Sequence, residues 1–114
     1  MFRREYIETE WRGCPSITGK LEELVKESGI QEGLCVVSAP DLTTALGITS
    51  FWDKRGLEDL MDELDRDFPA RVDYQSQRTP FDSVGNVKGA VVGRSLSLII
   101  HEGKLVLGWS QGVV

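Results

Sequence analysis

The feature that most constrains the fold is a pair of apolar runs near the C-terminus, at residues 95–100 and 104–109. In both runs large apolar side chains alternate with polar or smaller ones, a pattern typical of strands with one buried face. Leu105, Leu107 and Trp109 share one face of the second run. Gly103 lies in the short connection and can take the positive φ of a tight hairpin. The sequence therefore predicts a hairpin whose apolar face the rest of the chain must cover.

Several other segments are rich in apolar and β-branched residues, which favour strands. Residues 2–11 predict an edge strand. The continuous apolar run 34–39, opened by Gly33, predicts a central strand. Residues 42–50 continue it, either as a second strand or as a bent extension of the first, and residues 71–75 predict a short strand.

Two segments have the spacing of amphipathic helices. The first follows Thr18, a suitable N-cap, and Gly29 ends it. The second follows Asp53 as N-cap and stops before Pro69. Its apolar stripe consists of Leu57, Leu60, Met61, Leu64 and Phe68. The opposite face is acidic and reads as a solvated surface, so we expect Leu60 and Leu64 to be buried against a sheet.

A third, shorter helix is expected after a polar loop over residues 76–85. It begins at Asn86 and is closed by Gly93. Together these elements predict an α+β fold, with mixed or antiparallel β-sheets in a sandwich-like arrangement, two main helices and one short helix. A chain of 114 residues is long enough for one core but not for two, so we expect a single domain over residues 1–114.

Charge and composition narrow the function classes. A net charge of −5 argues against a nucleic-acid-binding surface, which needs a basic stripe. No apolar run approaches the about 20 residues of a membrane span. The first residues are charged and do not resemble a signal peptide. Cys14 and Cys35 have no motif spacing, so we expect free thiols and a cytoplasmic protein.

The C-terminal third also carries a family resemblance. The residues that carry it are Gly85-Asn86-Val87-Lys88, Gly93-Arg94-Ser95, Ile100, Gly103, Leu105 and Leu107-Gly108-Trp109-Ser110-Gln111. They resemble the YjbQ-like family, which is also described as a secondary thiamine-phosphate synthase family. The resemblance extends from about Ile17 to the end of the chain, and it implies a YjbQ-like fold and a homotrimer.

At the reactive positions the chain departs from the family pattern. The resemblance implies histidines at three places, and this sequence has Leu42, Ser76 and Asn86 there. Asp41 is the alternative match for the first place, because the chain has one extra residue in that turn. Phe51 stands where the family carries a glutamate. The remaining histidine, His101, falls in the hairpin turn, where we expect it to be exposed.

Hydroxyl, amide and carboxylate groups remain near these vacated positions. Candidate pocket or phosphate-binding residues are Asp41, Thr43, Thr44, Lys88 and Gln111. Oxygen ligands of this kind hold Mg²⁺ beside a phosphate, so weak Mg²⁺ binding is the one cofactor left open. Lys88 near the start of the short helix would favour an anion. The alternative is that the threonines satisfy backbone groups and Lys88 is solvated. We expect no imidazole-based metal site.

Three functions follow from these residues. The first is a divergent, non-catalytic or weakly active trimeric protein that binds a small molecule, with a phosphorylated compound as one candidate. The alternative is a secondary thiamine-phosphate-synthase-like enzyme that joins a pyrimidine diphosphate to a thiazole phosphate with Mg²⁺. A second alternative is a structural assembly subunit that pairs through an exposed strand edge. The sequence leaves open whether catalysis remains.

Overall fold

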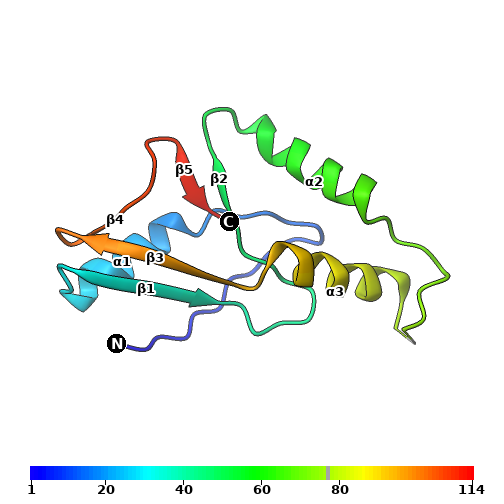
Figure 1. Cartoon of the computed structure of the whole chain (residues 1–114), viewed down its shortest axis with the longest axis horizontal. Coiled ribbons are helices and arrows are strands. Elements are labelled where there is room, and N and C mark those ends of the chain that lie inside the picture. Colours follow the sequence, from blue (N-terminus) through cyan, green and yellow to red (C-terminus); the bar gives the residue numbers. More distant parts are fainter. Residues whose placement is uncertain (77) are drawn as a thin grey trace.

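The computed structural model describes residues 1–76 and 78–114, which form three helices and five strands (Figure 1). In chain order these elements are α1 (Thr18–Ser28), β1 (Gly33–Ser38), β2 (Ile48–Ser50), α2 (Arg55–Asp67), α3 (Pro80–Val92), β3 (Ser95–His101), β4 (Lys104–Leu105) and β5 (Gln111–Val113). The predicted α+β class is confirmed, and the strand pairs are antiparallel.

The predicted hairpin is formed by β3 and β4, and β3 is the middle strand of a sheet with the order β1-β3-β4. Its turn uses positive φ at Glu102 (51°) and at Gly103 (75°), which suits a two-residue connection. The second strand is much shorter than expected and ends at Leu105. The chain leaves the sheet after Val106, whose N–H still donates to the Ile99 carbonyl, so Trp109 is 83% exposed and lies outside any strand.

Strand β1 pairs with β3 from Gly33 opposite Ile100 to Ser38 opposite Ser95. In the described part of the chain it is an edge strand, so the prediction of a central strand is wrong. The strand expected over residues 42–50 is reduced to β2, which pairs with β5 in a second sheet. A continuous apolar run thus marks a strand here without showing that both of its faces are covered.

The core lies between α1 and the sheets. Its central cluster consists of Ile17, Leu21, Leu46, Leu98 and Val113. The backbone N–H of Ile17 donates to the carbonyl of Val113 at 2.8 Å, and the Thr18 hydroxyl accepts from the N–H of Val113 at 2.9 Å. These two bonds fix the last strand against the start of α1, and Val113 is 0% exposed.

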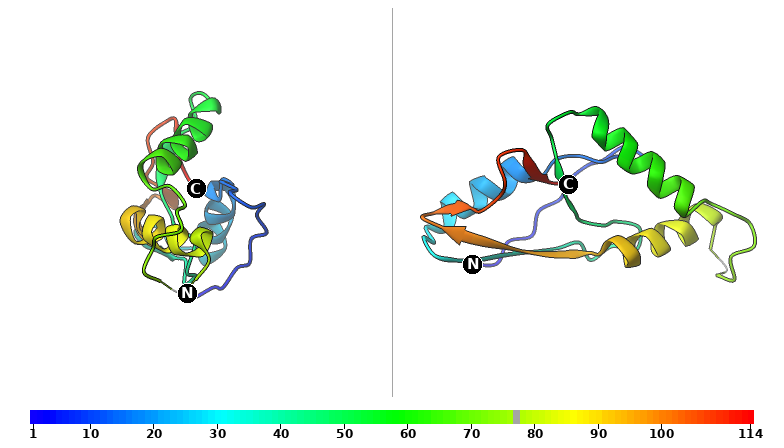
Figure 2. Two further views of the ribbon diagram at one scale, coloured as in Figure 1. Left: turned by 90° about the vertical axis from the view of Figure 1, so that its right-hand side faces the viewer. Right: turned by 45° about the horizontal axis from the view of Figure 1, so that its top comes forward.

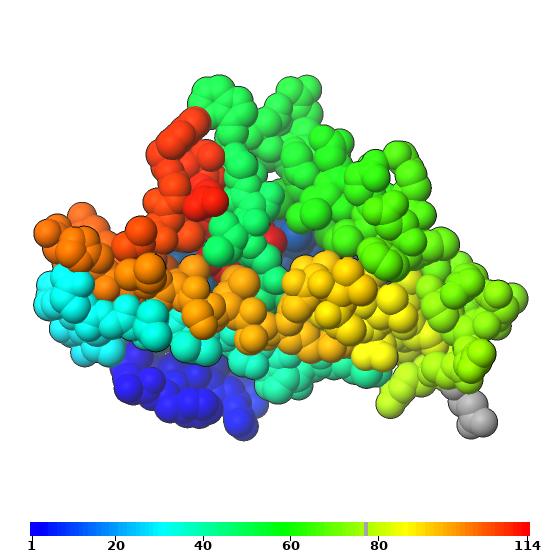
Figure 3. Space-filling model, in the orientation of Figure 1, coloured from blue at the N-terminus to red at the C-terminus, as the bar shows by residue number. Residues whose placement is uncertain are grey.

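The other face of the three-stranded sheet is open. Leu34, Val36, Ile99 and Val106 are each more than half exposed. Leu34 is paired with Ile99, and the N–H of Val106 donates to the Ile99 carbonyl at 2.9 Å, so the side chains form a row across the strands. Helix α1 lies behind the sheet in Figure 1, and Figure 3 looks onto the uncovered strands. This apolar row is called the open sheet face below.

Helices α2 and α3 lie beyond the strand ends (Figures 1 and 2). Within the described residues α2 has no fully buried side chain, so the prediction that Leu60 and Leu64 are buried against a sheet is wrong. The stripe is only half-buried, because the helix projects from the molecule. Pro69 does stop the helix, which ends at Asp67.

Helix α3 is longer than predicted. It begins at Pro80 instead of Asn86, because Thr79 is its N-cap and the Thr79 hydroxyl accepts from the N–H of Asp82 at 3.2 Å. Proline at the first helical position is compatible with this start. Residues 80–85 of the predicted 76–85 loop are therefore helical, and residue 77 of that loop lies outside the described residues.

The strands predicted at residues 2–11 and 71–75 are absent from the described chain. Side-chain contacts hold both segments instead. Arg3 pairs with Glu27 of α1, and the Tyr74 hydroxyl donates to the Pro69 carbonyl at 2.9 Å. The guanidinium of Arg71 lies 4.5 Å from the centre of the Tyr74 ring. Apolar and β-branched composition therefore did not ensure a strand where no partner strand lies alongside.

Two general expectations concern cysteines and membranes. Cys14 and Cys35 are free thiols, as predicted, and partial burial raises the pKa of both. A membrane-crossing helix, which must be both long and apolar, does not occur among the helices of the described residues.

Candidate functional site

Arg94 joins two of the three vacated positions. From the first residues after α3, its side chain reaches back over the helix toward the loop that follows β1. Its Nη2 donates to the Leu42 carbonyl at 2.6 Å and to the Asn86 Oδ1 at 3.1 Å, and its Nε donates to the Asp41 carbonyl at 3.0 Å. A further bond of 3.3 Å reaches the Asn86 carbonyl. The guanidinium thus occupies the space between residues 41–42 and Asn86.

Two glycines of α3 allow this close approach. A Cβ on Gly89 would lie 2.6 Å from Nη2 of Arg94, and a Cβ on Gly85 would lie 2.9 Å from Cγ2 of Thr43. Both distances are too short for a real contact. The loop at residues 41–44 and the Arg94 side chain therefore pack directly on the helix backbone, and the position between Leu42 and Asn86 is filled.

The turn before this contact explains the role of Asp41 and Thr43. The Asp41 carboxylate accepts from the backbone N–H of Thr43 at 3.0 Å and lies 3.5 Å from its hydroxyl. This is an Asx turn, a local device by which an aspartate satisfies the backbone two residues on. Thr44 is exposed in the same turn. The side chain that satisfies the backbone here is therefore Asp41, whereas the alternative to a pocket site gives that role to the threonines.

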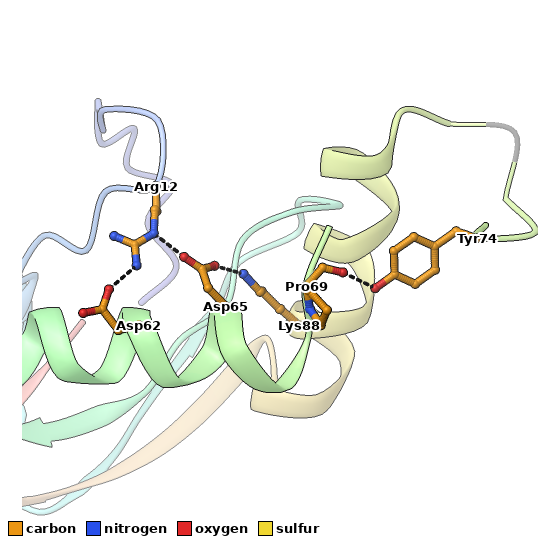
Figure 4. Close-up of polar contacts among 6 residues, drawn as sticks. All are labelled: Arg12, Asp62, Asp65, Pro69, Tyr74 and Lys88. Carbon is orange, nitrogen blue, oxygen red and sulfur yellow. Dashed lines mark hydrogen bonds and ion pairs between the residues drawn. The ribbon is translucent and has the colours of Figure 1, made fainter. Parts of the chain in front are cut away.

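Lys88 is neither solvated nor near a helix start. It lies in the second half of α3, where it pairs with Asp65 of α2, and only 20% of its side chain is exposed. Asp65 also accepts from Arg12 Nε at 2.6 Å, and Arg12 donates to Asp62 at 2.8 Å (Figure 4). Lys88 therefore does not lie at the helix start that the sequence predicts, and its ammonium group is paired with a carboxylate.

This ion-pair network ties the N-terminal segment, α2 and α3 together. The hydrogen bond from Lys88, with a smaller contribution from Arg12, lowers the pKa of Asp65 below its usual value. The stabilisation is present above the pKa of the unfolded chain and is lost as pH falls through the lower pKa of the folded state. The network should therefore weaken in acid.

We expect Asp65→Asn to lower the free energy of unfolding by less than about 1 kcal/mol at neutral pH, because the side chains are partly exposed and solvent screens them. The difference from the parent chain should shrink as pH falls below about 4, where the carboxylate of the unfolded chain becomes protonated, and it should vanish below the lower pKa of the folded state. Urea unfolding at several pH values measures this. Asp62→Asn is the matched control, since Asp62 has one ion pair, and its effect should be smaller. An Asp65→Asn penalty that stays constant down to acid pH would contradict the assignment.

The third vacated position is elsewhere. Ser76 lies in the exposed loop before α3, where its hydroxyl accepts from the N–H of Arg78 at 3.3 Å. The loop is at the far end of α3 from Arg94 (Figure 1). The described chain therefore brings Leu42 and Asn86 together but does not bring Ser76 to them. Within residues 1–76 and 78–114 there is also no cluster of His, Cys, Asp or Glu that could hold a metal ion.

Gln111 belongs to a different part of the molecule. It lies at the start of β5, and its Oε1 accepts from the N–H of Gly108 at 2.8 Å. It lines an open hollow of about 410 Å³ together with Phe51, the position of the family glutamate, and Trp52 and Trp109. The predicted pocket residues thus lie in three places: Asp41, Thr43 and Thr44 are in the loop that Arg94 contacts, Lys88 is paired with Asp65, and Gln111 lines the hollow.

His101 is exposed, as the sequence predicts, but it precedes the hairpin turn instead of lying in it. It ends β3, its side chain is 60% exposed, and its Nδ1 lies 2.8 Å from Glu32 Oε2. The bond from His101, followed by one from the backbone N–H of Glu102, lowers the pKa of Glu32. The pair contacts none of the other candidate residues in the described structure.

Sequence reasoning missed Arg94, Trp52 and Asp65 as site residues. Arg94 stands between two matched residues of the family pattern, Gly93 and Ser95, but nothing in that spacing shows where its long side chain ends. Asp65 was counted as part of a solvated acidic face. One signal for this ion pair is present in the sequence: Lys88 and Asp65 carry opposite charges and lie on two predicted helices that follow each other along the chain.

Comparison with known proteins agrees with this fold. A model of the UPF0047 protein YjbQ-like family matches residues 4–114. A UPF0047 protein of Archaeoglobus fulgidus is 30% identical over 99 residues, which cover 86% of this chain and 75% of that protein. An uncharacterized conserved YjbQ/UPF0047 family protein from Clostridium acetobutylicum is similar in structure, with 33% identity, a TM-score of 0.80 and coverage of 87% of this chain and 75% of that one.

A YbjQ-like protein of unknown function from Sulfolobus solfataricus shares the fold with a TM-score of 0.86 at 20% identity, over 94% of this chain and 78% of that one. The residues matched by the family model include every element described above, from α1 to the C-terminal strand. The chain belongs to the YjbQ-like UPF0047 family.

Proposed function

We propose that this chain is a trimeric, non-catalytic or only weakly active member of its family that binds a small molecule. The observation that carries the proposal is the Arg94 side chain, which fills the space between Leu42 and Asn86. Both positions are ones where the family resemblance implies histidines. An imidazole site cannot form where a guanidinium is bonded to backbone carbonyls, so the chemistry of such a site is not available to this chain.

The enzyme alternative has less support. Joining a pyrimidine diphosphate to a thiazole phosphate requires cationic groups to stabilise the departing diphosphate. Lys88 is paired with Asp65, and Arg94 is bonded to carbonyl oxygens, so binding a phosphate there would break existing contacts. The hollow beside Gln111 has no charged lining residue in the described structure. An uncharged ligand fits that hollow better than a phosphorylated one.

Assembly is proposed from surface area. The chain exposes 8330 Å², whereas a compact monomer of 12.7 kDa exposes about 6,200 Å². Its radius of gyration of 15.7 Å also exceeds the about 13 Å of a compact domain of this length. The excess area is of the size that specific interfaces bury. The open sheet face is the surface that we propose neighbouring copies cover. The free thiols favour the cytoplasm as the location.

The test is a thermal-shift screen with thiamine precursors, inorganic phosphate, divalent metal ions and uncharged ring compounds. A ligand that binds only the folded state raises the melting temperature by mass action. We expect an uncharged compound to raise it and phosphate with Mg²⁺ to have no effect. Turnover of the two thiamine precursors at about 1 s⁻¹ or faster, a usual rate for an enzyme, would contradict the non-catalytic assignment. The absence of any stabilising ligand would contradict small-molecule binding.

A further inference from the structure

A pair of exposed tryptophans stands beside the hollow at the end of the two-stranded sheet. Trp52 is 76% exposed and Trp109 is 83% exposed. Their rings meet edge to face, with centroids 5.0 Å apart and planes at 86°. Both residues line the hollow of about 410 Å³, and Phe51 is a third aromatic residue in its lining. Large π surfaces therefore face an open space of the size of a small-molecule site.

Hydrogen bonds hold the backbone around the hollow in place. Residues 108–111 form a turn closed by a bond of 3.0 Å from the N–H of Gln111 to the Gly108 carbonyl. The N–H of Phe51 donates to the Ser110 carbonyl at 2.6 Å, and the Ser50 hydroxyl donates to the Ser110 hydroxyl at 2.9 Å. These bonds hold the turn that carries Trp109 beside the segment that carries Trp52. The backbone therefore keeps the two tryptophans adjacent, in addition to the contact between their rings.

Gly112 lets the Phe51 ring and the Thr18 hydroxyl pack directly on the backbone of β5. A Cβ at this position would lie 2.4 Å from the Phe51 ring and 2.8 Å from the Thr18 hydroxyl oxygen. No ordinary side chain fits there, so the backbone of β5 itself forms part of the lining. Glycine at such a place permits a close approach of backbone to another group.

The polar groups of the hollow are uncharged hydrogen-bond donors. Gln111 uses its Oε1 to accept from Gly108, which fixes the amide orientation and leaves the two N–H bonds of Nε2 without a recorded acceptor in the described chain. The Ser110 hydroxyl lies 2.9 Å from the Ser50 hydroxyl, and a hydroxyl can both donate and accept. Donors beside π surfaces match a flat ring that carries carbonyl or ring-nitrogen acceptors.

We propose that this hollow binds an uncharged, planar heteroaromatic compound, with the ring against Trp52 or Trp109 and its acceptors toward Gln111 and Ser110. The proposal rests on the small-molecule-binding part of the proposed function and names its site and ligand class. Stacking on tryptophan supplies the attraction. The donors of Gln111 and Ser110 select compounds with acceptors. An anion or cation gains little, because the described lining residues carry no charge.

Titration of intrinsic tryptophan fluorescence with uracil is the direct test. We expect saturable quenching with a dissociation constant of about 1 mM, a value suited to a ligand of so few atoms. Dihydrouracil is the matched ligand control, since it keeps both carbonyl acceptors and loses the aromatic ring, and it should bind at least several-fold more weakly. Equal binding of the two compounds would overturn the stacking assignment.

Variants locate the site. Trp109→Ala and Trp52→Ala should each weaken uracil binding about 5- to 150-fold, the range for loss of one stacking partner. Trp11→Ala is the matched control, because Trp11 is 77% exposed and also lies edge to face on another ring, that of Phe81. Its removal should leave affinity unchanged. Gln111→Glu keeps the acceptor for Gly108 and removes the amide donors, so it should weaken uracil binding about tenfold. An effect of Trp11→Ala equal to that of Trp109→Ala would overturn the site.

Other occupants give different results. Preferential binding of glucose or of tetramethylammonium, lost in Trp109→Ala, would overturn the ligand class but leave small-molecule binding intact. Absence of any saturable response, with Trp109→Ala shifting the oligomeric state in light scattering, would show that a second copy covers the hollow and would overturn the site. Absence of a response here, together with a thermal shift from another class of compound, would overturn this proposal and not the proposed function.

Discussion

Replacing Ile100 by alanine should lower the free energy of unfolding by about 2–5 kcal/mol, the usual cost of removing a large side chain from a packed core. Ile100 is 2% exposed. It lies in the middle strand of its sheet, paired with Gly33 on one side and Leu105 on the other. The described structure offers little room for collapse around it, because a strand is fixed on each side. Urea unfolding at one fixed protein concentration measures the change.

The control for this variant is Val72→Ala. Val72 is 92% exposed in the loop after α2, and its replacement should change the unfolding free energy by no more than about 0.5 kcal/mol. Similar effects of the two variants would mean that the core is not where the structure has it. The fixed concentration matters because an assembling protein gains stability by mass action.

Ile99→Lys should convert the proposed trimer to monomers. Ile99 is 58% exposed in the single chain, so lysine fits the monomer fold, but it would place an unpaired charge in the middle of the open sheet face. Burying such a charge at an interface costs several kcal/mol, which is enough to separate the copies at micromolar concentration. Light scattering should show a threefold fall in mass relative to the parent chain.

Val72→Lys is the matched control for assembly, because it adds the same charge to an exposed apolar position outside the open sheet face. Its mass should equal that of the parent. A parent chain that is monomeric at micromolar concentration would remove the trimer proposal. If the parent is a trimer and Ile99→Lys leaves it intact, the trimer proposal stands, but the interface lies on a surface other than the open sheet face.

The two tests address neighbouring residues of one strand with opposite roles. Ile100 and Ile99 follow each other in β3, and their side chains point to opposite faces of the sheet. The sequence predicts this alternation, because Leu96, Leu98 and Ile100 share one face of the strand while Ser95 and Ser97 share the other. In the structure α1 lies against the Ile100 side, and that choice makes one variant a test of stability and the other a test of association.

Local signals in the sequence did determine several elements. Gly29 ends α1 in the left-handed conformation, with φ of 69°, and Gly103 closes the hairpin. Pro69 limits α2. The strand over residues 34–39 and the family pattern of the C-terminal third were also found correctly. Each of these features depends on the backbone conformations that a few adjacent residues can adopt, and the sequence contains that information directly.

Tertiary structure alone decided how the candidate site is filled. The sequence placed Leu42 and Asn86 together through family resemblance, but the group between them is Arg94, whose reach over α3 depends on Gly89 having no side chain. Lys88 pairs with Asp65 of α2, and Trp109, which precedes β5, contacts Trp52, which follows β2. A long side chain has several rotamers of similar energy, and contacts between distant segments select one of them. Local residues by themselves determined where α1 and α2 end and where the hairpin turns, and packing decided which polar groups are already paired.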